Sequence, residues 1–508
     1  MPMLPDFLSA ILATGRAVAA HRASPRVVVS AEGWALAGEA LAAGALTLAG
    51  LWGDRDAVHA ALLDEAAGAL AVVSLDCPAA SFPSLARTHP PAIRPERTIR
   101  DLFGLEPVGL PDPRPWPDHG RWGVRHPLGT PLEAPATGLP YAFMPVEGEA
   151  LHQIPVGPVH AGIIEPGHFR FTASGETVVR LEERLGYVHK GIEGLMEGAT
   201  PAEGARLAGR TSGDSTVAYA FAYARAVEAA LDVQPPPRAV WLRALMAELE
   251  RLANHFGDIG AICNDAAFAI MLAHCGVLRE RVLRAAHAAF GHRLMMDRVV
   301  PGGVATDLTP AAADGIRALL VTARAAFPPL VRLYDETTSL QDRTVGTGNV
   351  DGALVRRFGA GGYVGRASGR AFDTRRALPY APYEALRFEV PVRTTGDVDA
   401  RIWVRIEEVR QSLDIVEQIL DGLPAGPIST AFEPTGVAAE ATVMVEGFRG
   451  DVLAHVRLGA DGRIERCHLR DPSWFQWPLL EAAIEGNIVA DFPLCNKSFN
   501  CSYSGHDL

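Results

Sequence analysis

The spacing of hydrophobic positions changes twice along the chain and divides it into three parts. The first part, residues 1–105, combines an alanine-rich amphipathic segment with apolar runs at residues 26–30 and 70–75 that are typical of strands. We therefore expect a small α+β domain here. The second part, residues 106–150, is dense in proline and glycine between residues 107 and 140. Because proline lacks a backbone donor, this part is predicted to be a linker or an extended docking arm.

The third part, residues 151–508, is predicted to be a larger and mainly helical domain with strands at its periphery. A β-like stretch at residues 155–172 is interpreted as two strands joined by a turn, and strands are expected again from residue 441. Between them the apolar residues recur every three or four positions, as in helices that pack one face into a core. Helices are expected at residues 203–231, 238–254, 266–287, 310–325 and 398–420. The predicted fold class is therefore α+β.

Length, net charge and hydropathy disfavour some classes of binding partner and a direct membrane span. The chain has 508 residues, more than one hydrophobic core normally serves, and a formal net charge of −12. That charge disfavours binding to nucleic acid or to an anionic membrane surface, because both are negative. The longest uncharged apolar run, residues 40–53, would give roughly 21 Å of helix against a hydrocarbon core of roughly 30 Å. We expect no direct membrane span and membrane attachment through partner subunits.

The first residues do not have the pattern of a secretory signal, since no Lys or Arg precedes the apolar stretch and Asp6 interrupts it. A cytoplasmic location is therefore expected. Six cysteines are scattered along the chain, and no two of them form a CxxC pair. In the cytoplasm such cysteines would stay reduced. No GxGxxG motif follows a predicted strand, so a dinucleotide site is not expected.

Ordered sequence strings connect the chain to a known family. Residues 95–115, PERTIRDLFGLEPVGLPDPRP, resemble the end of the 30-kDa subunit of respiratory complex I. The strings that follow resemble the complex I 49-kDa subunit in the same order: VGPVHAGIIEPGHFRF, RLGYVHKGIE, ELERLANHFGDIGAICND, RLMMDRVVPGGV, DRTVGTGNV, GRASGRAFDTRR and GDVDARIWVRIEEVRQS. They look closer still to the large subunits of group 4 membrane-bound [NiFe]-hydrogenases, the type found in formate hydrogenlyase and hydrogenase-4.

The resemblance implies a complex I 30-kDa-like domain followed by a 49-kDa-like, hydrogenase large-subunit-like domain. It also implies partners: a small subunit with a [4Fe-4S] cluster, related to the complex I B subunit, a ferredoxin-like subunit, and antiporter-like and other membrane subunits. Such a complex would place this chain peripherally on the cytoplasmic face of the inner membrane.

The family holds its nickel-iron centre with two CxxC pairs, and this chain lacks both. The resemblance places Ser212 and Ser215 at the first pair and Ser502 and Gly505 at the second. Serine hydroxyls cannot replace the bridging thiolates that nickel and iron require. We therefore expect no metal ligands here, no nickel-iron centre, and no hydrogen turnover by this chain.

Other residues of the family cavity are present or altered. His160 matches a histidine of the complex I quinone loop, whereas Ile164 and Gly213 replace a second histidine and a tyrosine. These two replacements weaken a conventional quinone site, but a quinone stays possible as a ligand, with His160 as a donor and Asp214 as a second cavity group. Glu165 follows the hydrogenase pattern, in which this carboxylate resembles a proton relay; the alternative is a carboxylate that caps a turn.

Three further features have structural and functional interpretations. His189 and Glu193, four residues apart, are expected to share a helix face and to conduct protons or form an ion pair. Arg449 resembles the arginine beside the hydrogenase metal site and could hold a ligand or bind Glu446. The alternating charges from Asp397 to Arg410 (Asp397, Arg401, Arg405, Glu407, Glu408, Arg410) indicate a buried ion network rather than catalysis.

Three functions are compatible with this sequence. The first is the large subunit of a hydrogenase-like or formate-hydrogenlyase-like redox complex that couples electron transfer to ion translocation without nickel. The second is a C/D-type subunit of an NADH-quinone oxidoreductase that helps to form a quinone site. The third is a non-catalytic scaffold that transmits conformational change between its partners.

Overall fold

The apolar runs of the N-terminal part form one sheet. The computed structural model describes residues 7–134, 140–160, 164–433 and 436–508. The sheet has the order β1-β3-β6-β5-β4, with β3 and β6 parallel and the other pairs antiparallel. Its strands are β1 (Arg16–Ala17), β3 (Arg26–Val29), β4 (Thr47–Gly53), β5 (Ala57–Asp64) and β6 (Ala69–Asp76). The helices of this part are α1 (Phe7–Ala13), α2 (Ala31–Ala42) and α3 (Ile93–Phe103). The predicted runs at 26–30 and 70–75 are both strands.

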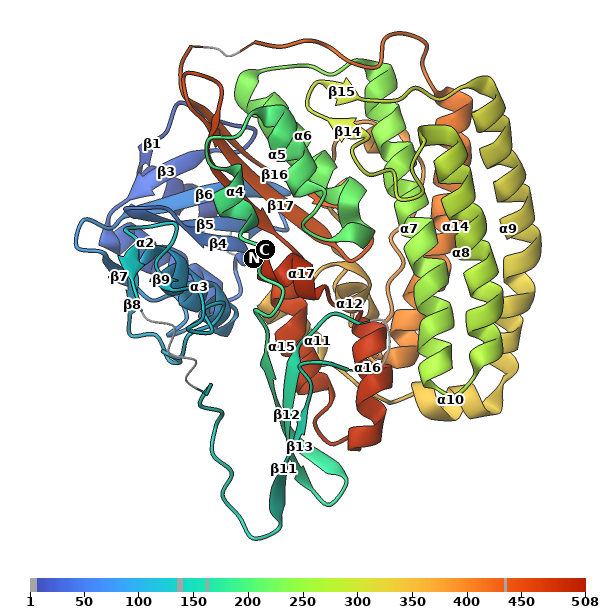
Figure 1. Ribbon diagram of the computed structural model, residues 1–508, viewed down its shortest axis with the longest axis horizontal. Coiled ribbons are helices and arrows are strands. Elements are labelled where there is room, and N and C mark those ends of the chain that lie inside the picture. Colours follow the sequence, from blue (N-terminus) through green and yellow to red (C-terminus); the bar gives the residue numbers. More distant parts are fainter. Residues whose placement is uncertain (1–6, 135–139, 161–163, 434–435) are drawn as a thin grey trace, which may run out of the picture.

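A second sheet lies against this one and joins the two parts of the chain. It has the order β18-β17-β16-β2 and contains β2 (His21–Arg22), β16 (Ala439–Glu446), β17 (Asp451–Leu458) and β18 (Ile464–Arg470). Its long strands are buried along nearly their whole length, because α6 (Thr216–Leu231) covers one face and the N-terminal sheet lies on the other (Figure 1). Strand β2 pairs with β16 in parallel, so the N-terminal part contributes a strand to the second domain.

The proline-rich part has little regular structure, as predicted. Its strands are two or three residues long. Strand β8 (Glu106–Val108) pairs with β7 (Ser81–Pro83), and β9 (Val124–Arg125) pairs with β10 (Leu132–Glu133).

Residues 155–172 do not form the two strands and turn that were predicted. Three strands, β11 (Leu151–Val156), β12 (His168–Ser174) and β13 (Thr177–Arg184), form a sheet that projects from the body, and residues 157–160 are in no strand (Figure 1).

Long helices form a bundle at the other side of the molecule (Figure 1). The bundle consists of α7 (Pro237–Asp265), α8 (Ala269–Phe290), α9 (Pro310–Glu336) and α14 (Val398–Gly422). Helix α9 continues past the predicted end at residue 325, through Pro328 and Pro329. The remaining elements are α4 (Ile192–Met196), α5 (Pro201–Ala208), β14 (Val299–Val300), β15 (Gly303–Val304), α10 (Thr338–Thr344), α11 (Gly352–Phe358), α12 (Gly362–Ala367), α13 (Thr374–Ala377), α15 (Ser473–Ala483), α16 (Phe492–Phe499) and α17 (Tyr503–Asp507).

The predicted helix at 203–231 is two helices with a turn between them. Helix α5 ends at Ala208, and α6 starts at Thr216. Gly209 lies where a Cβ atom would come within 2.9 Å of the Thr216 hydroxyl, so the chain folds back tightly at this point. The turn carries Ser212, Gly213, Asp214 and Ser215, and the first three of these residues line a cavity.

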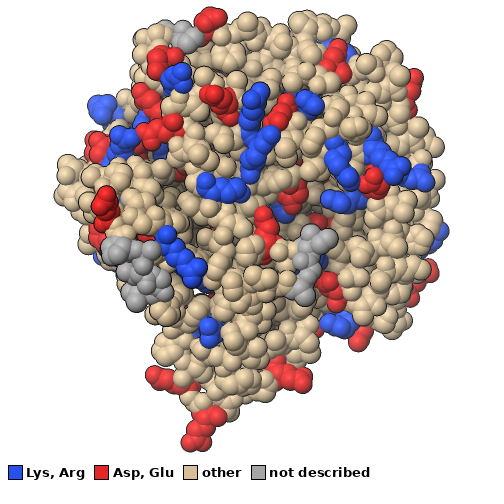
Figure 2. Space-filling model, in the orientation of Figure 1, with Lys and Arg blue, Asp and Glu red and all other residues tan. Residues whose placement is uncertain are grey.

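The mixed α+β fold class is confirmed. None of the helices within the described ranges is long and apolar enough to cross a membrane. Figure 2 shows side chains of both charge signs dispersed over one face, with no extended basic patch.

Candidate functional site

A polar cavity of about 260 Å³ lies where the α5–α6 turn meets the C-terminal helices. Four segments that are far apart in sequence build it. They are the loop at Ile164 and Glu165, the turn between α5 and α6 at residues 212–215 (the serine turn), the β16–β17 turn that carries Arg449, and the C-terminal segment from Asn496 to Ser504. We call it the serine cavity. Ser212, Asp214, Arg449 and Ser502 all line it.

The residues at the four positions where the resemblance predicts metal ligands are linked by hydrogen bonds that converge on Asp214. The Gly505 N–H donates to the Ser502 hydroxyl at 2.8 Å, and the Ser502 and Ser212 hydroxyl oxygens are 2.9 Å apart. Ser212 also donates to Asp214 Oδ1 at 2.8 Å, and Ser215 donates to the same oxygen at 3.3 Å. Since a carboxylate only accepts, the Ser502 hydroxyl must donate to Ser212. The hydroxyl groups therefore satisfy one another.

Gly505 has no room for a side chain. A Cβ atom at this position would overlap the Asp471 carboxylate and would lie 2.8 Å from the Ser502 hydroxyl. Asp471 is buried and fixed, because its carboxylate accepts from the Tyr219 hydroxyl at 2.6 Å and from the Ser473 N–H at 2.8 Å. The space that a ligand side chain at residue 505 would need is thus occupied by a carboxylate.

Arg449 and Asp214 form a forked ion pair at the wall of the serine cavity. The two guanidinium nitrogens donate to the two carboxylate oxygens at 2.7 and 2.5 Å, and one of them also donates to Ser215 at 3.0 Å. Removal from water disfavours the ionised form of Asp214, but the charge of Arg449 and its hydrogen bonds outweigh this and lower the Asp214 pKa. The predicted pairing of Arg449 with Glu446 is wrong, because Glu446 binds Arg366 instead.

Glu165 lies at the mouth of the serine cavity with its side chain exposed. One of its carboxylate oxygens accepts from the Ser504 N–H at 3.1 Å, at the start of α17. This is the geometry of the capping alternative. The same position keeps the carboxylate in contact with both the solvent and the cavity, so a role as a proton relay stays a prediction.

His160 is turned toward its own loop. Its Nε2 lies 2.8 Å from the carbonyl oxygen of Gly167, and because that oxygen can only accept, Nε2 carries a proton. In the neutral ring, Nδ1 is then an acceptor. His160 is not among the residues lining the serine cavity, whereas Ile164 and Gly213, which stand at the two altered positions, both line it. Residues 161–163 of this loop lie outside the described ranges.

The prediction that His189 and Glu193 share a helix face is wrong, because α4 begins only at Ile192. His189 Nδ1 bonds the carbonyl oxygen of Asp507 at 2.6 Å. Glu193 instead binds His468 at 2.6 Å and Arg466 at 2.9 Å. Burial alone would raise the Glu193 pKa, but these two neighbours bring it to about 2, so Glu193 is half of a structural ion pair.

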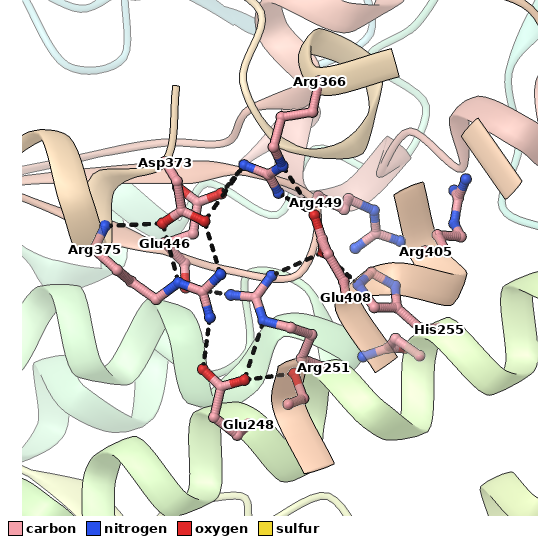
Figure 3. A network of polar contacts seen from close by, with 12 residues as sticks. Glu248, Arg251, His255, Arg366, Asp373, Arg375, Arg405, Glu408, Glu446 and Arg449 are labelled. Atoms are coloured by element: carbon pink, nitrogen blue, oxygen red, sulfur yellow. Dashed lines mark hydrogen bonds and ion pairs between the residues drawn. The ribbon is translucent and has the colours of Figure 1, made fainter. Parts of the chain in front are cut away.

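The charged string near residue 400 belongs partly to a buried ion network (Figure 3). Arg366 binds Glu408 at 2.6 Å and Glu446 at 2.9 Å, and Glu408 also contacts His255 at 2.6 Å. The predicted network is confirmed for Arg405, which pairs with the Asp258 carboxylate, and for Glu408. It is wrong for Glu407 and Arg410, which pair with each other at the surface. Arg401 is buried but donates to backbone carbonyls and Ser498, and Asp397 caps α14.

Several residues near the serine cavity were not predicted from the sequence. Asn496, Lys497 and Asn500 line it from α16 and its C-cap. Glu250 is buried beneath the serine turn and accepts from the Val217 and Ala218 N–H groups at the start of α6. Burial dominates and raises the Glu250 pKa to about 8. A glutamate on the apolar face of a predicted helix was the one available signal for it.

Comparison with known proteins finds two family models that match parts of this chain. Residues 52–136 match the family model of the respiratory-chain NADH dehydrogenase 30 Kd subunit, and residues 265–438 match that of the 49 Kd subunit. Formate hydrogenlyase subunit 5 of Escherichia coli (strain K12) is 33% identical over 446 residues, which cover 86% of this chain and 78% of that protein. The chain belongs to this complex I-related hydrogenase family.

Other relatives include both hydrogenase subunits and NADH-quinone oxidoreductase subunits. Hydrogenase-4 component G of Escherichia coli (strain K12) is 32% identical over 85% of this chain and 77% of its own length. The D 1 subunit of the NADH-quinone oxidoreductase of Roseiflexus sp. (strain RS-1) is 32% identical over 67% of this chain and 94% of its own length. Hydrogenase and NADH-quinone oxidoreductase subunits are thus both among the relatives, at similar identity. Among the residues that the structure describes, no group of three or more His, Cys, Asp or Glu side chains could hold a metal ion.

Proposed function

We propose that this chain is the large, cytoplasmic-side subunit of a membrane-bound, complex I-related redox complex that works without a nickel-iron centre in this chain. In the proposed complex the chain docks on a [4Fe-4S] small subunit, a ferredoxin-like subunit and antiporter-like membrane subunits. It couples electron transfer to ion translocation from the cytoplasmic face of the membrane.

The hydrogen-bond chain across the serine cavity is the observation that supports this proposal most strongly. A nickel-iron centre needs soft thiolate ligands, and the four positions here offer three hydroxyl groups and a glycine. The hydroxyls bond to one another and to Asp214, and the Asp471 carboxylate fills the space beside Gly505. These residues do not fit the metal centre of the hydrogenase relatives.

Metal analysis of the purified intact complex tests the absence of nickel. We expect less than stoichiometric nickel and no hydrogen turnover, with the formate hydrogenlyase complex of a relative assayed in parallel as the positive control. Stoichiometric nickel in this chain would contradict the proposal.

The Glu165→Gln variant tests the coupling role. We expect electron transfer and ion pumping by the complex to fall by roughly 100-fold or more, since a positioned proton-transfer group contributes about 10²- to 10⁴-fold. Glu176→Gln, in the exposed turn of the projecting sheet, is the matched control and should retain both activities.

A second candidate function, a non-catalytic scaffold, is favoured by the same hydrogen-bond chain, because the Ser502, Ser212 and Ser215 hydroxyls already donate within the site and have no hydrogen left to donate to a ligand. Equal activity of the Glu165→Gln complex and the wild type would favour the scaffold. The quinone-site alternative is weakened by His160, whose protonated nitrogen is held by Gly167. Quinone reduction by the intact complex that is lost in His160→Gln would restore it.

A further inference from the structure

The layer between the N-terminal sheet and the second sheet has an apolar half and a polar half. The apolar half consists of buried side chains from both sheets, such as Leu63, Met444 and Leu453. The polar half contains four buried histidines, which are His21 on β2, His59 on β5, His455 on β17 and His468 on β18. We call these four residues the histidine cluster. Because the charge of histidine changes near neutral pH, their position makes the domain boundary a candidate for a response to protons.

The rings of the histidine cluster gather around Trp52 of β4. Between ring centroids, the indole lies 5.1 Å from His468, 5.2 Å from His455 and 5.5 Å from His59. His21 stacks on His455 at 6.0 Å with an interplanar angle of 14°. The N-terminal sheet supplies Trp52 and His59, whereas the second sheet supplies the other three rings. These ring contacts therefore join the two sheets.

A chain of hydrogen bonds fixes the protons on two of these rings. The carbonyl oxygen of Ser24, which can only accept, lies 2.7 Å from His21 Nδ1, so this nitrogen carries a proton. In the neutral ring, His21 Nε2 then accepts from the Thr442 hydroxyl at 2.9 Å. Because the single hydrogen of this hydroxyl is used, its oxygen accepts from His455 Nδ1 at 3.0 Å. In the neutral His455 ring, Nε2 therefore carries no proton.

An added proton would meet no acceptor on two of the rings. His455 Nε2 and His468 Nε2 are buried and have no hydrogen-bond partner among the residues that the structure describes. The other nitrogen of His468, Nδ1, lies 2.6 Å from the Glu193 carboxylate. His59 Nε2 is also unpartnered, since the Asp54 carboxylate oxygen is 3.9 Å away, too far for a hydrogen bond. Protonated His455 or His468 would thus carry a buried N–H group without an acceptor.

The charged groups around the histidine cluster are already neutralised in pairs. They come from both sheets, from the loop after β4 and from α4, and the pairs are Arg26 with Glu440, Arg457 with Asp54, Arg466 with Glu193, and Arg470 with Asp451. These arginines and carboxylates are equal in number. No carboxylate of this set is therefore left to balance an additional positive ring in the packed layer.

We propose that the histidine cluster is an acid-sensitive contact, which holds the N-terminal domain against the second domain while its rings are neutral and releases it when they take up protons. Protons from the solvent are the only species taken up, and no covalent bond changes. The contact does not depend on the proposed redox function, since no electron or metal takes part in it.

The direction of the pH dependence follows from the burial of the rings. Burial is the main cause that lowers the pKa of all four histidines, for His59 to about 4. When the sheets part, water hydrates the charged rings, so the parted form binds protons more readily. The packed form is therefore favoured above about pH 6.5 and loses stability as the pH falls below it. At about pH 5, each ring that stays neutral when packed favours the parted form by about 30-fold.

Distances between spin labels on the two domains, measured by pulsed electron resonance on the full-length chain, test this contact. The labels are attached at Ala66→Cys, in the β5–β6 turn, and Ala460→Cys, in the β17–β18 turn. Both positions are exposed, whereas the native cysteines are buried. We expect one distance at about pH 7.5 and a second, longer one at about pH 5, with unchanged far-UV circular dichroism. Identical distances at both pH values, or a longer distance that appears only with loss of the dichroism, would overturn the proposal.

Two variants test the role of the rings. His455→Gln keeps an N–H for Thr442 but cannot take up a proton, so its ratio of parted to packed molecules at about pH 5 should be about 30-fold lower than that of the wild type. His59→Phe keeps a ring beside Trp52 and should lower the ratio in the same direction. His152→Gln, at an exposed histidine on β11, is the matched control and should respond as the wild type does. Wild-type ratios in both His455→Gln and His59→Phe would overturn the role of the histidine cluster.

Discussion

The buried ion network around Glu408 and the serine cavity are both rich in charged and hydroxyl groups, but their surroundings differ. In the network, Glu408 binds Arg366, Arg251 and His255, and all four side chains are buried (Figure 3). Around the serine cavity, Asp214 has one charged partner and Glu165 has none within the ion pairs of the described residues.

The difference in surroundings separates carboxylates that stabilise the fold from carboxyl groups that could exchange protons. Burial disfavours the ionised form of Glu408, yet Arg366, His255 and Arg251 together hold its pKa well below the usual range. Glu250, beneath the serine cavity, has no such set of cations, and its pKa is raised to about 8. A carboxyl group that retains its proton near neutrality is suited to proton exchange, whereas a permanently ionised one is suited to holding elements together.

Removing Glu408 should have the largest effect on stability. Glu408→Ala leaves Arg366, Arg251 and His255 without their shared counter-charge in the core, and we expect a loss of about 3–5 kcal/mol in the free energy of unfolding. Urea unfolding followed by tryptophan fluorescence measures it. The neighbouring Glu407→Ala removes only surface pairs, with Arg410 and Arg393, and should cost less than about 1 kcal/mol. Equal losses in the two variants would contradict the assignment.

Glu250 should make stability depend on pH in the opposite sense to an ion-paired carboxylate. Its folded pKa of about 8 lies above the unfolded value, so its contribution is complete below about pH 4.5 and is lost as the pH rises through 8. We expect Glu250→Gln, whose single amide oxygen can accept from only one of the Val217 and Ala218 N–H groups, to lower the free energy of unfolding but to flatten its fall between pH 5 and pH 8 by about 3–4 kcal/mol. Parallel pH profiles for variant and wild type would show that Glu250 is ionised when folded.

A methyl group at Gly505 should cost about 1–3 kcal/mol, because it would press on the Asp471 carboxylate. Gly213→Ala is the matched control in the same cavity, since a Cβ atom there meets nothing within 4 Å. Its unfolding free energy should stay within about 0.5 kcal/mol of the wild type. Thermal unfolding of both variants measures the contrast, and a Gly505→Ala protein as stable as Gly213→Ala would show that Asp471 moves aside freely.

The smallest effect is expected at the hydroxyl chain itself. Ser212→Ala removes the link between Ser502 and Asp214, but the Ser502 oxygen still accepts from Gly505 and Asp214 still has Arg449. We expect a loss of about 0.5–1.5 kcal/mol, the net value of a hydrogen bond, in the same unfolding assay. A loss as large as that of Glu408→Ala would place the serine cavity with the structural network.

The sequence alone determined the mixed α+β class, the proline-rich part between the domains, the helical bundle and the family. It did so because these rest on local periodicity and on ordered strings of residues. The resemblance also predicts, without coordinates, that serine and glycine stand at the metal-ligand positions of the family, and this placement stays a prediction.

Only the tertiary structure decided what those residues do. The Ser212–Ser502 contact joins residues 290 positions apart, and the clash at Gly505 comes from Asp471 on a neighbouring strand end. The helix break between α5 and α6, the separation of His189 from Glu193 and the turn of Arg449 toward Asp214 likewise depend on which segments pack together. Local propensity describes each segment by itself, whereas hydrogen-bond partners and cavities arise only where distant segments meet.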